Sequence, residues 1–228
     1  MYNLLMQSIH LYRVLHDNEY ELLQDKGTLG TGEMITLSGD KALYSGKKAQ
    51  DIDGGKYFFF SLGEAVHYMD ICNRGYNNHE TGRERFDSPI LIVEVPIEIA
   101  KENFTGDLYS LGMGSAMVAE TILRTEDIDK VIKKGCYQIV NGKENIDELR
   151  KESEKWFDLD YLKSGKVEGG IPEVLALAKL GMKVFDGEIK KGDCPETDIE
   201  IDNILSSLAT KIKERTVVPE KFDKGLGI

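Results

Sequence analysis

Hydrophobic and polar positions alternate in several short segments of the first 140 residues, and such alternation is typical of β-strands. The pattern predicts strands at residues 9–15, 56–61, 89–95, 117–124 and 136–140. Apolar residues crowd both faces of 89–95, so we expect this strand in the interior of a sheet. The first 140 residues therefore indicate a β-rich core.

A helical spacing of apolar residues separates some of these strands. It predicts helices or single turns, with Asp17 as a helix cap and Gly27 as a helix end. The predicted segments are 18–24, 62–72, 98–103 and 125–132. The stretches 28–55 and 73–88 are rich in Gly, Ser or charged residues, and we expect them to be connecting loops. A Gly-rich stretch at 108–115 leads into the strand at 117–124, with a loop expected at 112–115.

After Asn141 the pattern becomes helical, with segments at 146–162, 174–180 (behind Pro172) and 198–214. The prediction is thus an α+β fold, with a β-rich domain over 1–141 and a helical appendage over 142–228. Two arrangements remain open for the appendage: a separate unit, or a helical layer packed on the same core.

The composition narrows the class of protein. The chain has 228 residues, 41% of them hydrophobic and 30% charged, which is typical of a globular protein. The longest clear apolar run, Ile90–Val93, ends at Glu94, far short of the roughly 18 residues that a membrane span needs. The net charge of −11 and the pI near 4.9 make nucleic acid an unlikely partner, because phosphate backbones are bound mainly by basic side chains.

The chain termini and cysteines bear on location and metals. The N-terminus MYNLLMQSIH lacks the basic start and cleavage site of a signal peptide, so we expect the cytoplasm or delivery into the cytosol of a target cell. Cys72, Cys136 and Cys194 fit neither a zinc pattern nor a disulfide framework. We expect no bound metal.

Three side chains stand out as candidates for chemistry. Arg13 lies in the first strand, and its guanidinium offers a rigid fork of donors for phosphate or ribose oxygens; the alternative is an ion pair with an acid. Ser61 ends the second strand and either caps the following helix, with Glu64 completing a capping box, or bonds to a ligand. Glu120 follows a Gly-rich stretch, and its alternative role is a solvated strand-edge residue.

In this order, the segments Leu11–Val14 (LYRV), Tyr57–Ser61 (YFFFS) and Val118–Ile122 (VAETI) resemble the split NAD⁺ site of the ADP-ribosyltransferase superfamily. In that family an Arg or His on a first strand holds the nicotinamide ribose and phosphate side. A second strand ends in an aromatic-Ser element before a helix, and a third carries the catalytic Glu. The resemblance covers about residues 9–140 and implies a split β-sheet core.

The resemblance also implies site roles. Glu120 would be the catalytic residue, and the cofactor-binding side chains would be those of Arg13, Ser61, Tyr68, Tyr12 and Phe60. Tyr68 is the candidate to stack on nicotinamide, although an ordinary core tyrosine is its alternative. Cleavage of the nicotinamide–ribose bond builds positive charge on the ribose, and a fixed carboxylate stabilises such charge by a few kcal/mol.

The implied activity is mono-ADP-ribosylation, with NAD⁺ as a substrate and a macromolecular acceptor that we expect to be a protein. An immunity or activator protein is a possible partner. Two departures bear on the acceptor: Val118 replaces the acidic or amide residue of arginine-specific members, and Leu62 and Gly63 interrupt the usual Ser-Thr-Ser. Modification of arginine is therefore not expected.

Other functions remain open. The chain could be an inactive interaction module with the same fold, or an NAD⁺ glycohydrolase. A cysteine hydrolase using Cys72 or Cys136 lacks a Gly-framed nucleophile turn. RNA 2′-phosphate transfer would need more basic residues in these segments than the chain supplies.

Overall fold

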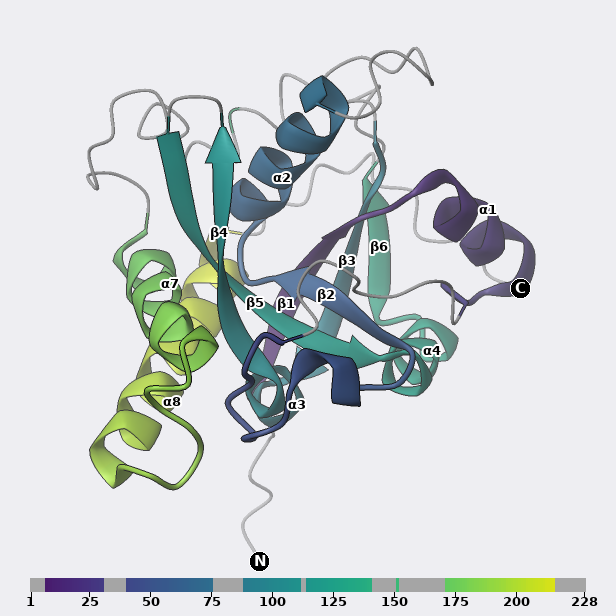
Figure 1. Cartoon of the computed structure of the whole chain (residues 1–228). Coiled ribbons are helices and arrows are strands. Elements are labelled where there is room, and N and C mark those ends of the chain that lie inside the picture. The colour runs from purple at the N-terminus through teal and green to yellow at the C-terminus, as the bar shows by residue number, and fades with distance from the viewer. Residues whose placement is uncertain are drawn as a thin grey trace, which may run out of the picture.

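The computed structural model describes residues 7–30, 40–75, 88–111, 114–140, 151 and 171–215, without the side chains of 70–75, 110–116 and 213–215. One six-stranded antiparallel sheet lies at the centre, with helices around it (Figure 1). The strands are β1 (Ser8–Val14), β2 (Gly55–Phe59), β3 (Ile90–Pro96), β4 (Phe104–Leu111), β5 (Gly114–Arg124) and β6 (Tyr137–Val140).

The helices alternate with these strands and then follow them. They are α1 (Asp17–Lys26), the 3-10 turn η1 (Ala49–Asp51), α2 (Leu62–Gly75), α3 (Ile97–Glu102), α4 (Thr125–Lys133), α7 (Pro172–Phe185) and α8 (Pro195–Arg215). The mixed α+β class predicted from the sequence is confirmed.

The strand order is β4-β5-β2-β1-β3-β6, so the sheet does not follow the order of the chain. Its two halves, β4-β5-β2 and β1-β3-β6, meet at a single pair of residues, Tyr12 and Phe59. The pairs within each half run over four to eight residues. The six strands therefore form one sheet, but β1 and β2 are paired only at this point and its two halves separate on either side of it.

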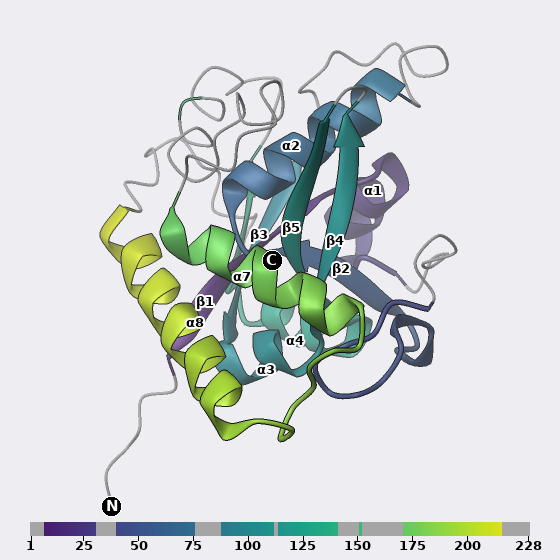
Figure 2. The same ribbon diagram turned by 60° about the vertical axis from the view of Figure 1, so that its left-hand side comes forward.

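Helices α7 and α8 pack on this sheet, with α7 across β4 and β5 and α8 against β1 and α7 (Figure 2). Their apolar side chains, such as Leu177 and Leu205, belong to the same buried cluster as those of the strands. At the closest point, a Cβ on Gly106 of β4 would lie 2.5 Å from the backbone of Gly181. Only glycine allows two backbones to approach so closely. The described part of the region 142–228 thus forms a layer on the common core.

Most predicted segments coincide with observed ones. Gly27 ends α1 in the left-handed conformation, with φ of 63°, as predicted, whereas the N-cap is His16 and not Asp17. The expectation of a loop over 112–115 is wrong in its described part, because Gly114 and Ser115 pair with Leu111 and Ser110 where β4 and β5 form a hairpin. The helix predicted at 146–162 lies outside the described residues apart from 151.

Candidate functional site

Tyr12, Phe59 and Glu120 form one row across the three strands of the sequence motifs. Tyr12 of β1 lies opposite Phe59 of β2, which in turn lies opposite Glu120 of β5. Residues directly opposite one another in antiparallel strands project to the same face. The three segments that stand far apart in the sequence are therefore consecutive neighbours in the sheet, and these three side chains share a face.

Glu120 is the centre of a buried polar group, which we name the Glu120 cluster and define as Lys41, Asp107, Tyr109 and Glu120. The Lys41 Nζ donates to Glu120 Oε2 at 2.8 Å and to Asp107 Oδ2 at 2.6 Å. The Tyr109 hydroxyl donates to Glu120 Oε1. The side chains of Lys41 and Glu120 are each only 1% exposed. Glu120 is thus an internal ion-pair partner, not the solvated edge residue of the alternative interpretation.

The charge state of Glu120 depends on opposing effects. Burial raises the pKa of the Glu120 carboxyl, the Lys41 ammonium lowers it, and the neighbouring Asp107 carboxylate raises it; the net shift is upward. Burial, followed by the Glu120 charge, also raises the pKa of Tyr109 well above its usual value. Tyr109 therefore stays protonated at physiological pH and donates its hydrogen bond to the carboxylate.

Ser61 is connected to the Glu120 strand through Glu64, a second buried carboxyl. The Glu64 backbone N–H donates to Ser61 Oγ at 3.2 Å, and the Ser61 hydroxyl donates to Glu64 Oε2 at 2.9 Å. This confirms the predicted capping role of Ser61 at the start of α2. Glu64 Oε1 also accepts the backbone N–H of Ala119 at 2.8 Å, directly beside Glu120.

Burial raises the pKa of Glu64 to about 8, against the hydrogen bonds from Ala119 and Ser61 that lower it. Glu120 contributes to the increase through like-charge repulsion. Two carboxyls at one site cannot both be ionised cheaply, so a neutral Glu64 beside an ion-paired Glu120 is the favoured arrangement at neutral pH.

Aromatic rings lie next to the Glu120 cluster. The ring of Tyr68 on α2 is 5.4 Å from that of Phe59 and 5.3 Å from that of Tyr109, between ring centres. Tyr68 and Tyr109 are both partly exposed, so this aromatic group connects the buried carboxylate with the surface. Tyr68 is therefore connected with Glu120 through Tyr109.

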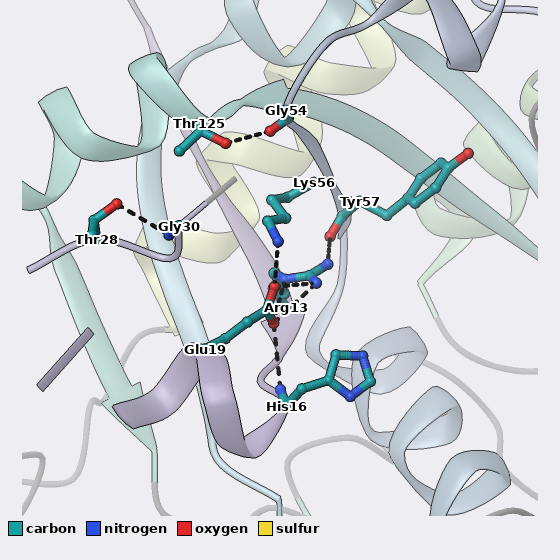
Figure 3. A network of polar contacts seen from close by, with 9 residues as sticks. All are labelled: Arg13, His16, Glu19, Thr28, Gly30, Gly54, Lys56, Tyr57 and Thr125. Atoms are coloured by element: carbon teal, nitrogen blue, oxygen red, sulfur yellow. Dashed lines mark hydrogen bonds and ion pairs between the residues drawn. The ribbon is translucent and has the colours of Figure 1, made fainter. Parts of the chain in front are cut away.

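Arg13 belongs to a different group, which we name the Glu19 cluster: Arg13, Glu19 and Lys56 (Figure 3). The Arg13 Nη2 lies 2.8 Å from Glu19 Oε1, and the Lys56 Nζ lies 2.8 Å from the same oxygen. Arg13 Nη1 also donates to the Tyr57 carbonyl at 2.9 Å, while the Tyr57 ring points away from the guanidinium. Burial raises the pKa of Glu19, but Arg13 and then Lys56 outweigh it and lower that pKa to about 2.

The structure does not bring Arg13 together with Glu120. Arg13 follows Tyr12 in β1, and successive side chains of a strand project to opposite faces. Because Tyr12 shares the face of Glu120, Arg13 projects from the other face, where Glu19 of α1 holds it. The alternative interpretation of Arg13, an ion pair with an acid, is what the structure shows.

Phe60 is likewise placed away from the Glu120 cluster. Its side chain is fully buried and contacts Phe104 edge-on, at 5.7 Å between ring centres. Phe59, one residue earlier, is the ring that lies beside Tyr68 and Tyr109. The structure therefore does not bring Phe60 to the Glu120 cluster, because Phe60 follows the end of β2 and packs into the core against Phe104.

Sequence interpretation missed Lys41, Asp107 and Tyr109. Lys41 lies in the predicted connecting stretch 28–55, and no local pattern separates it from the other basic residues. Asp107 and Tyr109 alternate along β4, which places both on the face of Glu120, but β4 itself was not predicted. A strand assigned to 104–111 would have revealed these two.

Within the described ranges, no three His, Cys, Asp or Glu side chains are grouped so as to hold a metal ion. None of the helices described is both long and apolar enough to cross a bilayer. Comparison of the chain with protein-family models, with curated proteins and with solved structures gives no match.

Proposed function

We propose that this chain is an ADP-ribosyltransferase-type enzyme, which cleaves NAD⁺ at the nicotinamide–ribose bond with Glu120 as the catalytic carboxylate. The observation that carries the proposal is the row formed by Tyr12, Phe59 and Glu120. It joins the three segments of the family resemblance on neighbouring strands, at the point where the sheet splits. Chance similarity of three short segments would not require them to be adjacent in the fold.

The surroundings of Glu120 suit stabilisation of positive charge on a ribose. Its two oxygens accept hydrogen bonds from Lys41 and Tyr109, which fix the carboxylate. A fixed charge in a site of low dielectric stabilises an oxocarbenium-like transition state without reorganisation. The ring of Tyr68, which is partly exposed beside Phe59, offers a flat face for the planar, cationic nicotinamide ring of NAD⁺.

Two features define the proposed site. Arg13 has no part in it, because Glu19 and the Tyr57 carbonyl hold its guanidinium. Glu120 is 1% exposed, so NAD⁺ reaches it only when side chains over it move aside. ADP-ribose would pass to a protein acceptor, or to water in a glycohydrolase; Val118 argues against arginine as the acceptor.

The test is release of nicotinamide from NAD⁺ by the purified chain, with adenylate-labelled NAD⁺ and a cell lysate to detect transferred label. Replacing Glu120 by Gln removes the charge at nearly constant volume, and we expect a loss of at least about 100-fold in nicotinamide release. Glu126→Gln makes the same change on the exposed face of α4 and serves as the matched control. Circular dichroism and thermal melting verify that each variant is folded.

Wild-type protein that neither binds NAD⁺ nor releases nicotinamide would refute the enzyme proposal. Binding without turnover would support the inactive interaction module. If Glu120→Gln is folded and fully active, another group performs the chemistry. Should Glu120→Gln fail to fold, Glu120→Asp keeps the charge but withdraws it by one methylene, and the proposal then requires activity well below that of wild type.

A further inference from the structure

Among the described residues, Lys41 is the most deeply buried of the buried lysines. Its side chain is 1% exposed and contacts two carboxylates, those of Glu120 and Asp107. The Nζ also lies 4.7 Å from the centre of the Tyr57 ring, a cation–π contact. A buried lysine is destabilising unless it is paired, and here the carboxylates of Glu120 and Asp107 pair with it.

The Glu120 carboxylate depends on this ammonium. Within the part of the chain that the structure describes, the titratable groups that act most strongly on Glu120 or are acted on by it are Lys41, Asp107 and Tyr109 of its cluster, together with Glu64 at the start of α2. Asp107 is a like charge, and Tyr109 and Glu64 are neutral at pH 7 when their pKa values are raised as described. Lys41 is thus the one cation among these four neighbours. Without it, burial and Asp107 would favour a protonated, uncharged Glu120.

Backbone contacts hold Lys41 in place although it lies outside the strands. The Tyr44 N–H donates to the Phe104 carbonyl at 2.8 Å, and Thr105 Oγ1 donates to the Ala42 carbonyl at 2.8 Å, which attaches the segment to β4. From the other side, the Lys191 N–H donates to the Tyr44 carbonyl at 2.7 Å.

The C-terminal helices complete this attachment. The Tyr44 hydroxyl donates to Asp198 of α8, and the Phe185 ring at the end of α7 lies 5.7 Å from the Lys41 Nζ. The helical region therefore helps to fix the residue that faces Glu120.

We propose that Lys41 is a positioning residue, which keeps the Glu120 carboxylate ionised and oriented for the reaction. The inference rests on the proposed function for its catalytic part, but the effect of Lys41 on Glu120 is a property of the folded protein alone. Lys41 binds Oε2 and Tyr109 binds Oε1, so each oxygen retains a lone pair for a ribose hydroxyl.

The experiment measures the titration of Glu120 by side-chain carboxyl NMR, with its resonance assigned by comparison with Glu120→Gln. In Lys41→Gln we expect the pKa of Glu120 to rise by about 1–3 units relative to wild type, as is usual when a close opposite charge is lost. Lys41→Arg keeps the charge and should restore most of the wild-type value. Lys101→Gln removes another buried, ion-paired lysine, whose partners are Asp202 and Glu98 rather than Glu120, and should leave the titration unchanged.

The pH profile of nicotinamide release provides the second readout. Its acid limb should move to higher pH in Lys41→Gln by the same amount as the NMR titration, with rescue by Lys41→Arg. A wholly structural role would lower activity equally at every pH. Lys41→Gln that is more active than wild type at pH 7 would overturn the inference, because Lys41 would then block the site.

The outcomes distinguish this inference from the proposed function. If wild type has no activity but the Glu120 titration depends on Lys41, the enzyme proposal fails and the ionising role stands. An unchanged Glu120 titration in folded Lys41→Gln overturns the inference whatever the activity. If Lys41→Gln does not fold, the NMR titration of Glu120 in the wild-type protein tests the inference. A Glu120 that is protonated at pH 7 would then contradict it.

Discussion

Glu64 gives the sharpest prediction of stability from this structure, because its carboxyl is fully buried and its pKa is raised from 4.5 to about 8. Between these two values the folded protein binds one proton that the unfolded chain has released. Stability therefore falls as pH rises through this window, by about 1.4 kcal/mol per pH unit. Over the whole window the loss is on the order of 5 kcal/mol. Stabilisation by the neutral carboxyl is complete below pH 4.5 and is lost above pH 8.

The substitution Glu64→Gln removes this dependence, because an amide is neutral at every pH and nearly the same size. At pH 5 we expect the variant to be less stable by about 1 kcal/mol, through a poorer set of hydrogen bonds with Ser61 and Ala119. At pH 9 the order reverses, and the variant becomes more stable by several kcal/mol, up to about 4. Other titrating groups are common to both proteins and cancel in the difference.

Urea unfolding followed by circular dichroism at pH 5, 7 and 9 measures this difference. Glu126→Gln, on the exposed face of α4, is the control and should differ from wild type by less than about 0.5 kcal/mol at each pH. A stability difference between Glu64→Gln and wild type that stays constant from pH 5 to 9 would refute the reasoning. It would mean that Glu64 is ionised in the fold or reaches solvent.

Two further predictions concern the core. Glu19→Gln should lower the free energy of unfolding by about 3 kcal/mol at pH 7, because it leaves the buried Lys56 and the partly buried Arg13 without their carboxylate. Because the pKa of Glu19 is about 2, this difference should shrink as pH falls from 4.5 toward 2, and equal urea midpoints at pH 7 would count against the ion pair. Gly181→Ala should destabilise by about 1–3 kcal/mol, since its Cβ would lie 2.7 Å from the Thr105 carbonyl oxygen, whereas exposed Lys179→Ala on the same helix should be nearly neutral. Helix propensity alone would stabilise Gly181→Ala by about 1 kcal/mol, so a higher urea midpoint would show that α7 is not docked on β4.

Local pattern was sufficient for most of the elements. The strands β1, β2, β3 and β6 combine β-branched and aromatic residues with the period of two, and each was predicted within about two residues of its observed bounds. Strand β4 was missed because Gly106 and its polar neighbours weaken the strand signal. Its pairing with β5 and the close approach of α7 stabilise it, and neither is a local property.

The candidate site divides in the same way. The capping of α2 by Ser61 and Glu64 was predictable because the two residues are three positions apart, so that the helix start itself brings them together. The contact of Lys41 with Glu120 spans 79 residues, and no spacing rule foresees it. Arg13 and Phe60 were assigned to the site through the family resemblance. The segments that carry them lie side by side in the sheet, but these two side chains do not face Glu120.

The sequence by itself determined where the chain extends, where it coils and which residues carry charge, since these depend on neighbours a few positions away. Only the tertiary structure decided that β2 lies between β1 and β5, which face of each strand meets α1 or α2, and that a lysine from a connecting segment neutralises Glu120. The physical reason is that pairing register and burial are set by contacts between distant segments, and a shift of a single residue in register exchanges one face for the other.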